Sequence, residues 1–183
     1  MLDLRSYHDS AWPDELKPHG EAFDREPFED WYARNLPHVS HLHPKLAEQW
    51  VYKHWGHTRF DFIPLDSLRW ELQVWKGDDV LRDVRREFGG ELHPDFDYDV
   101  FNRDYVGHRH PTAAALDQGT WDYPIVVLST PAGLLSLDGD FPSVRYVLVE
   151  GHQRQRYLNA LHAKGLAPAG PHEVFVLNSD ITG

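Results

Sequence analysis

The strongest pattern in the chain is a short apolar run that ends abruptly at an acid and a glycine. Residues 146–149 are apolar or aromatic, Glu150 and Gly151 follow, and a helix-like pattern rich in His and Arg begins directly afterwards. We interpret this as a buried strand, 145–149, that turns sharply into a helix, 152–164. Such a turn gathers backbone N–H groups and the positive end of a helix dipole at one point, which favours an anion such as phosphate.

The same kind of reasoning predicts the other regular elements. Apolar positions recur at helical spacing between Pro44 and Trp55, and the segment from Asp78 to Phe88 has one apolar face with acids at its start. The expected helices are 27–32, 44–55, 78–88, 111–116 and 152–164, and the expected strands are 60–65, 124–128, 145–149 and 173–177. Helices and strands mixed in this way predict an α/β fold of the α+β kind, with a small mixed sheet flanked by helices.

Three segments show no sustained period. Residues 1–25 read as an extended arm over the surface, and residues 138–142 read as a turn. Residues 91–110 form a polar, aromatic segment that is too long for a simple connection, so we expect a lid or a partner surface there. The predicted organisation is an N-terminal arm and helical extension, 1–57, and a core, 58–183, within one compact unit.

Length and composition limit the classes of protein. The chain has 183 residues, of which 41% are hydrophobic, and this suits one folded domain with a substantial core. It has no cysteine, which excludes disulfides, thiolate metal sites and thiol catalysis. The N-terminal residues lack the apolar centre of a signal peptide, and no apolar run approaches the length of a membrane span. We therefore expect a cytoplasmic protein, or one held at the inner face of the membrane by a protein partner.

Charge is unevenly distributed along the chain. The net charge of −11 argues against a general nucleic-acid binder, which would normally be basic. No acidic residue lies between Glu150 and Glu173, whereas Arg154, Arg156 and Lys164 do. The predicted strand-to-helix turn therefore begins a basic segment within an acidic protein, which suits a local phosphate site.

Two blocks in the C-terminal half follow each other in a recognisable order. The first is Gly119-Thr-Trp-Asp-Tyr-Pro124-Ile-Val-Val127, and the second is Tyr146-Val-Leu-Val-Glu-Gly151-His-Gln-Arg154-Gln-Arg156-Tyr-Leu-Asn-Ala160. They resemble the ParB/sulfiredoxin superfamily, whose members have a glycine followed by Pro-Ile-Val-Val on a central strand, and later a strand, Gly-x-x-Arg-x-Arg and a helix. The resemblance covers about residues 60–178 and is best over 116–177. It implies a ParB/sulfiredoxin-like core.

Departures from the family pattern select among its branches. Sulfiredoxin activity needs a cysteine where this chain has His152, so that activity is excluded. The segregation proteins have Gly-Glu-Arg-Arg where this chain has Gly-His-Gln-Arg, and no helix-turn-helix is evident, so a DNA clamp is not expected. The form Glu-Gly-His-x-Arg is most similar to the ParB-like nuclease branch, and size, acidity and N-terminal extension resemble plasmid-encoded fertility inhibitors.

This resemblance implies an activity, cofactors and partners. It implies a DNase with ATPase activity, ATP being a substrate, which blocks conjugative or T-DNA transfer through a type IV secretion system. The implied partners are DNA and a coupling or channel ATPase of that system. Metal-assisted hydrolysis of DNA phosphodiesters would use a divalent cation, for which Mg²⁺ is the expected ion.

The candidate site residues cluster at the strand-to-helix turn. Gly151 would let backbone approach a phosphate, and Arg154 and Arg156 would neutralise it. Glu150, His152 and Arg154 are the candidate catalytic residues, because a carboxylate and a histidine handle protons and an arginine stabilises charge. Glu150 is also a candidate metal ligand. The other candidate ligands are Asp138 and Asp140.

Each of these residues also has a structural interpretation. Arg154 could form a salt bridge to Glu150 or to Glu173, and Arg156 could be an exposed helical arginine. Glu150 and His152 could cap the helix. Asp-Gly-Asp is a common turn sequence, which accounts equally well for the two candidate aspartates.

The other histidines and the tryptophans carry weaker signals. Histidine pairs lie within reach of a metal at His54/His57, His41/His43 and His108/His110, without a third ligand at diagnostic spacing. The tryptophans are expected mainly as core anchors, although exposed ones in the acidic N-terminal half would indicate a partner interface. The alternative function is therefore a non-catalytic inhibitor on the same fold, whose N-terminal half binds a basic partner such as a secretion coupling ATPase.

Overall fold

A five-stranded mixed sheet forms the centre of the protein. The computed structural model describes residues 1–20, 22–103 and 109–179. The strand order is β2-β8-β4-β7-β3. The strands are β2 (Arg69–Trp75), β8 (His172–Asn178), β4 (Ile125–Ser129), β7 (Tyr146–Glu150) and β3 (Val84–Arg85). β4 lies parallel to β8 and antiparallel to β7, so the sheet is mixed and the expected mixed α/β class is confirmed.

Both faces of the three central strands are buried. Ile125 and Val127 point to one core cluster, whereas Val126 and Leu128 between them point to the other. β8 alternates in the same way, since Val174 and Val176 lie on one side and Phe175 and Leu177 on the other. Successive side chains of a strand point to opposite faces, so a continuous apolar run requires a cover on each face.

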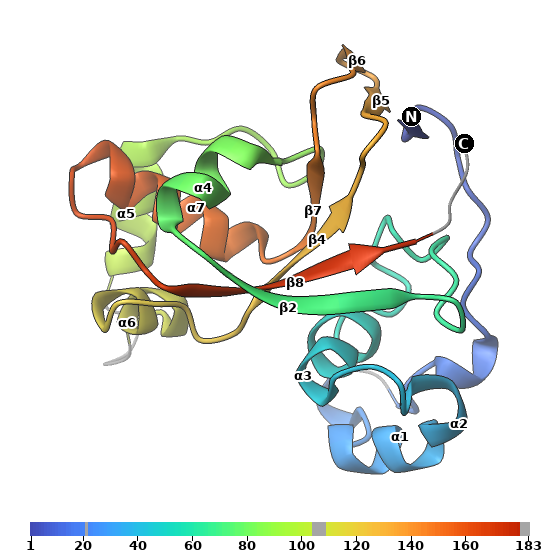
Figure 1. The fold of residues 1–183 in the computed structure, drawn as a ribbon. Helices are drawn as coiled ribbons and strands as arrows, with labels where there is room; N and C mark the ends of the chain where they lie inside the picture. Colours follow the sequence, from blue (N-terminus) through green and yellow to red (C-terminus); the bar gives the residue numbers. More distant parts are fainter. Residues whose placement is uncertain (21, 104–108, 180–183) are drawn as a thin grey trace.

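The C-terminal helices cover the first face. They are α4 (Gly77–Asp83), α5 (Pro94–Asn102), α6 (Pro111–Asp117) and α7 (His152–Ala163). Tyr157, Leu158 and Leu161 of α7 are buried against the sheet, and Phe101 of α5 stacks on Tyr157 with ring centroids 5.0 Å apart. Figure 1 shows α4, α5 and α7 together on one side of the sheet, and Ala113 and Leu116 of α6 belong to the same cluster.

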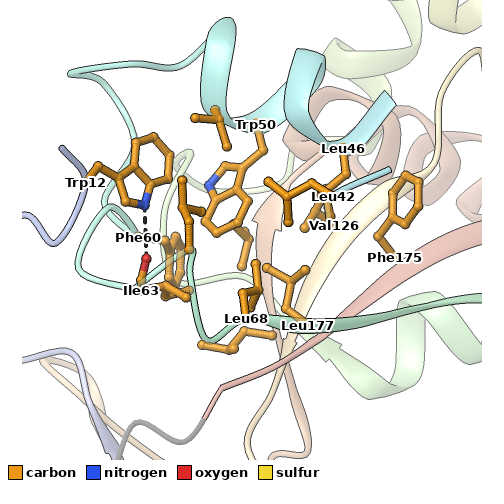
Figure 2. Packing of buried hydrophobic residues seen from close by; sticks show 14 of the residues in the cluster. Trp12, Leu42, Leu46, Trp50, Phe60, Ile63, Leu68, Val126, Phe175 and Leu177 are labelled. Carbon is orange, nitrogen blue, oxygen red and sulfur yellow. Dashed lines mark hydrogen bonds between the residues drawn. The ribbon is translucent and has the colours of Figure 1, made fainter. Parts of the chain in front are cut away.

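The N-terminal segment covers the opposite face. Its helices are α1 (Phe28–Arg34), α2 (Leu36–Val39), α3 (Pro44–Leu46) and the π-helix η3 (Ala47–Tyr52), preceded by the short 3₁₀ turns η1 (Asp14–Leu16) and η2 (Ala22–Asp24). Figure 2 shows Leu46 and Trp50 from this segment beside Val126, Phe175 and Leu177 of the sheet. The predicted helix 44–55 is thus present over residues 44–52, as α3 and η3, and it shares one hydrophobic cluster with the sheet.

The first residues also take part in the fold. β1 (Leu2–Asp3) runs parallel to β5 (Leu134–Ser136), which pairs with β6 (Gly139–Phe141) in a small second sheet. Trp12 is buried and donates from Nε1 to the carbonyl of Ile63 at 3.0 Å (Figure 2). The arm is therefore more than the surface covering that we expected. The predicted turn at 138–142 is mostly strand, because residues 139–141 form β6 and the turn of the hairpin lies at residues 137–138.

One predicted strand and one predicted helix differ from the structure. Residues 60–65 do not form a strand. Their backbone is irregular, yet the side chains of Phe60, Ile63 and Leu65 are buried, which accounts for the apolar pattern. The predicted helix 78–88 ends at Asp83, because Val84 leaves it to pair with Tyr146. Most of the predicted strands and helices otherwise occur where the pattern placed them.

Two of the longer elements were not foreseen. The first is strand β2, whose residues do not alternate clearly between buried and exposed positions, because Leu72 and Val74 on one face are exposed. The segment 91–110 contains helix α5, packed against α7, where we expected a loop acting as a lid or partner surface. Helix α5 buries Asp97 and Phe101, which is why a polar sequence there can be helical. Among the described residues, no helix has the length and apolar character needed to cross a membrane.

Truncation of Leu46 tests whether the N-terminal segment and the sheet fold together. Leu46→Ala removes a fully buried side chain from the shared cluster, so we expect the free energy of unfolding to fall by about 2–5 kcal/mol. The loss should appear in a single transition in urea, followed by both fluorescence and circular dichroism. Leu36→Ala, at an exposed leucine of α2, is the control and should change stability by less than about 0.5 kcal/mol. Two separate transitions would contradict a shared core.

Candidate functional site

The turn from β7 into α7 depends on a glycine. Gly151 has φ of 102°, in the left-handed region, and is the N-cap of α7. A Cβ atom at this position would lie 2.6 Å from Cγ2 of Ile125, on the neighbouring strand β4. Any larger residue would therefore meet both backbone strain and a steric clash. The predicted strand–glycine–helix junction is confirmed, with Glu150 as the last residue of the strand.

Glu150 lies in a contact with two cationic or potentially cationic side chains. Its Oε1 is 3.4 Å from Nε2 of His54 and 3.4 Å from Nη1 of Arg154, and its side chain is 17% exposed. Burial works to raise the pKa of Glu150, but the hydrogen bond and charge of His54, together with Arg154, hold that pKa below its usual value. Glu150 is thus ionised at neutral pH.

Arg154 is held between two carboxylates. Its Nε donates to Oδ1 of Asp122 at 3.0 Å, in addition to the contact with Glu150, and its side chain is 12% exposed. The guanidinium also lies 5.6 Å from the ring centre of Tyr123. The structural alternative for Arg154, a salt bridge to Glu150, is therefore present, and Asp122 is a further partner.

Lys53 adds a second cation to the same surface. Its Nζ lies 4.8 Å from the ring centre of Tyr123, on which Arg154 also packs. Lys53 and His54 come from the end of the N-terminal helical segment, whereas Tyr123 and Arg154 come from the core. The group His54, Lys53, Tyr123, Asp122, Glu150 and Arg154, which we call the junction site, thus joins both parts of the chain.

His152 faces a different environment. A Cβ atom added to Gly89 would lie 2.6 Å from Nη2 of Arg86 and 2.8 Å from Cδ2 of His152, so the three residues are packed closely together. Burial lowers the pKa of His152 to about 4, the charge of Arg86 acts in the same direction, and Glu150 opposes them. Its imidazole is therefore neutral at pH 7 and does not supply a positive charge to a phosphate.

Arg156 belongs with His152 rather than with Arg154. It pairs with Asp97 of α5, a completely buried aspartate that also accepts from the backbone N–H of His93 at 3.2 Å. Residues two apart on a helix point in nearly opposite directions, which accounts for the separation of Arg154 and Arg156. Burial, and then the charge of Arg156, lowers the pKa of the nearby Arg86. The two candidate phosphate-binding arginines thus lie in two clusters.

The candidate metal ligands are not gathered at one place. Asp138 contacts Arg85 at 3.5 Å and Asp140 contacts Arg5 at 3.7 Å, both near the β5–β6 hairpin. Arg85 pairs with Val147 near the start of β7, whereas Glu150 ends that strand. In Figure 1 the β5–β6 hairpin lies at the start of β7, whereas α7 follows the other end of this strand. The structure does not bring Asp138 and Asp140 beside Glu150, because the length of β7 separates them.

The predicted histidine pairs also make other contacts. His41 Nε2 lies 2.8 Å from the carbonyl of Leu65, and Nδ1 of His43 accepts from the backbone of Lys45. Over residues 1–20, 22–103 and 109–179, no group of three or more His, Asp or Glu side chains is arranged to hold a metal ion. His108 lies outside the described residues.

Sequence reasoning missed three residues that the structure places at these clusters. His54 attracted attention only as half of a metal pair, and Asp122 lies inside the Gly119–Val127 block without a role assigned to it. Asp97 was treated as part of a loop. No pattern along the chain connects positions 54, 97 and 122 with the helix that begins after Gly151.

Three comparisons with known proteins bear on this site. Neither a scan against protein-family models, nor a search of the curated proteins, nor a search of the solved structures found a match.

Substitution of Gly151 tests the close approach of β4 to the turn. Gly151→Ala should lower the free energy of unfolding by the cost of a left-handed alanine, about 1–2 kcal/mol, plus about 1–3 kcal/mol for the clash with Ile125. Gly165→Ala is the matched control, because Gly165 also has a positive φ, 69°, but nothing within 4 Å of an added Cβ. Equal losses in urea denaturation would show that the contact with Ile125 carries no cost.

The buried imidazole of His152 predicts a pH dependence of stability. Its folded pKa of about 4 lies below the ordinary 6.5, so the unfolded chain takes up a proton between these values that the folded chain does not. The contribution of His152 to the free energy of unfolding is therefore complete above pH 6.5 and is lost as the pH falls from 6.5 to 4. Between pH 7 and pH 5 the loss is about 2 kcal/mol. His152→Gln should remove that part of the loss.

The comparison needs urea denaturation of three proteins at pH 7 and pH 5. His57→Gln, at an exposed histidine, should lose as much stability as the wild type. His172, whose pKa burial also lowers, contributes equally to all three proteins. The same pH dependence in His152→Gln and in the wild type would contradict the buried, neutral state of His152.

Proposed function

We propose that this chain hydrolyses phosphate esters at the junction site, as a ParB-like nuclease acting on DNA. The observation that carries the proposal is the 3.4 Å contact between Nε2 of His54 and Oε1 of Glu150 beside the N-terminus of α7. A histidine oriented by an ionised carboxylate is a common general acid and base, and the start of a helix favours a phosphate.

The geometry suggests which nitrogen does the chemistry. Nε2 of His54 faces Glu150, so it carries the proton and donates it to the carboxylate, which leaves Nδ1 as the proton acceptor. Nδ1 takes a proton from water as the water oxygen forms a bond to phosphorus. The protonated His54 then gives a proton to the leaving oxygen as its bond to phosphorus breaks.

Two cations at the site suit the charge of a phosphodiester. Arg154 lies in the first turn of α7, and Lys53 is adjacent to His54 in the chain. Both pack on the ring of Tyr123, which fixes them on the same surface as Glu150. In this proposal they hold the phosphate, while His152 and Arg156 support the helix from its other side.

A divalent cation is not well accommodated by these residues as they are placed. The two nearby carboxylates, Glu150 and Asp122, both contact the guanidinium of Arg154, which takes the position where a cation would be shared. We therefore derive no step through Mg²⁺. Hydrolysis of ATP at the same site, which the family resemblance implies, is part of the proposal and is tested in the same assays.

The alternative is a non-catalytic inhibitor on the same fold. It is favoured by the compensation of charge, because Arg154 is balanced by Glu150 and Asp122, and Arg156 by Asp97. The resemblance to the plasmid fertility-inhibition protein Osa suggests the same biological role for the nuclease and for the non-catalytic inhibitor. That role is blocking DNA transfer through a type IV secretion system, with its coupling ATPase as partner.

Cleavage of supercoiled plasmid tests the proposed activity. Replacing His54 or Glu150 by glutamine, His54→Gln or Glu150→Gln, should lower the cleavage rate by about 100-fold or more, because each removes one member of the acid–base pair. His57→Gln, at the exposed histidine three residues further on, should retain the wild-type rate. Each protein is assayed with Mg²⁺ and with EDTA, and ATP hydrolysis is followed in parallel.

The outcomes separate the two functions. Wild-type cleavage that survives unchanged in Glu150→Gln would show that the junction site is not the catalytic site. Absence of cleavage by the wild type under every condition, together with equal inhibition of plasmid transfer by wild type and Glu150→Gln in cells, would favour the non-catalytic inhibitor. Circular dichroism of each variant shows whether the fold is retained.

A further inference from the structure

Four buried nitrogen atoms without a hydrogen-bond partner are gathered on the side of α7 that carries Arg156. They are Nε and Nη1 of Arg86, Nε of Arg156 and Nε2 of His152, and none has a partner among the residues that the structure describes. A buried polar atom without a partner is costly, so several at one place indicate that a further group belongs there. We call Arg86, Arg156 and His152, together with Asp97, the Arg86 cluster.

Three segments of the chain form this cluster. Arg86 directly follows β3, His152 and Arg156 come from α7, and Asp97 comes from α5. Arg86 and His152 meet at Gly89, where an added Cβ would lie 2.6 Å from Nη2 of the one and 2.8 Å from Cδ2 of the other. Burial lowers the pKa of Arg86, and the charge of Arg156 acts in the same direction, so the two guanidinium groups are close.

The cluster has more positive than negative charge. Asp97 lies between the two arginines electrostatically, but its carboxylate already pairs with Arg156. Over the described part of the chain no carboxylate forms an ion pair with Arg86, whose Nη2 donates to the carbonyls of Gly89 at 2.8 Å and Gly90 at 3.4 Å. A half-buried cation that lacks a counter-ion is poorly stabilised, and a bound anion would remove this deficit.

We propose that the Arg86 cluster binds a phosphate dianion, either the free ion or the terminal phosphate group of a larger molecule. Arg86 would donate from Nε and Nη1 to two phosphate oxygens, in the paired geometry that a guanidinium offers to phosphate. Nε of Arg156 and Nε2 of His152 would supply two further donors. His152 takes part as a neutral imidazole with its proton on Nε2.

The burial of the four nitrogens favours a terminal phosphate over an internal one. Because these atoms are closed off from solvent, only the end of a molecule can enter between their side chains. An internal phosphodiester has a sugar on each side and a single negative charge. A terminal phosphate instead presents three free oxygens and a second charge, which suits a cluster of several donors.

The turn at Gly89 and Gly90 gives a way into the cluster. Both glycines are exposed, and their φ angles of 96° and 74° lie in the left-handed region. Phosphate oxygens can replace the two glycine carbonyls on Arg86 when this turn moves outwards, and no packed side chain has to leave the core. The site does not depend on the proposed activity, because it shares no residue with the junction site.

Titration of the full chain with inorganic phosphate at pH 7 tests the site. The imidazole signal of His152 in a ¹H–¹³C NMR spectrum, identified by its loss in His152→Gln, should shift to saturation in the wild type. Arg86→Gln should raise the Kd by about 10-fold or more, because it removes charged donors. Arg82→Gln is the matched control and should keep the wild-type Kd, since Arg82 is 63% exposed and pairs with Asp79 and Asp83.

Thermal unfolding separates a binding role of Arg86 from a structural one. Phosphate stabilises folded proteins non-specifically, and Arg82→Gln measures that part of the effect. The wild type and Arg82→Gln should gain more in Tm from phosphate than Arg86→Gln does. In phosphate-free buffer Arg86→Gln should unfold at the wild-type Tm or above it. A lower Tm there, with a wild-type response to phosphate, would make Arg86 structural and overturn the proposal.

Two dinucleotides test the kind of phosphate. The dinucleotide TpT, which has an internal phosphodiester only, should leave the His152 signal unchanged, and its 5′-phosphorylated form should shift it. A shift with inorganic phosphate alone would identify the free ion as the ligand. Equal binding of both dinucleotides would overturn the proposal, as would the absence of any saturable shift. It would also be overturned by a shift that is lost in Arg154→Gln and kept in Arg86→Gln, because the phosphate would then bind at the junction site.

Discussion

The structure depends on a sheet whose central strands are apolar on both faces. Ile125 to Leu128 in β4 and Val174 to Leu177 in β8 direct side chains alternately to two cores, so neither face can be left to water. One face is covered by helices that follow in the C-terminal part of the chain. The other face has no such helices, and the N-terminal segment covers it. This constraint explains why the N-terminal segment is built into the core.

The same constraint assembles the junction site. Because the N-terminal helices must lie against the sheet, the end of η3 reaches the C-terminal end of β7, where His54 meets Glu150. Gly151 lets the chain turn within contact of Ile125, so that α7 starts directly beside the strand that it leaves. The acid–base pair proposed for catalysis is therefore a product of the two layers that bury the sheet.

Charge is arranged by burial more than by sequence. Arg154 and Arg156 are two residues apart, yet one faces Glu150 and Asp122 and the other faces the buried Asp97. His152, which packs beside Arg86 in the cluster of Arg156, is neutral because burial disfavours its protonation. A basic segment that is uniform in sequence thus becomes two compensated groups, and an acidic protein has little free positive charge at its predicted phosphate site. At the far edge of the sheet, β2 is less completely covered than the other long strands.

The sequence by itself determined the local elements whose patterns are strong. The run of apolar residues 146–149 followed by Gly151 predicted the strand, the turn and the helix correctly, because these features depend on residues that are neighbours in the chain. Only the tertiary structure decided which distant residues meet. The sequence pattern did not predict strand β2, because Leu72 and Val74 are exposed and leave no alternation of buried and exposed positions. It did not predict helix α5 either, because the burial of Asp97 depends on its contact with Arg156 of α7. The pairing of His54 with Glu150 was hidden for the same physical reason: packing of separate layers, not periodicity, brings the two side chains together.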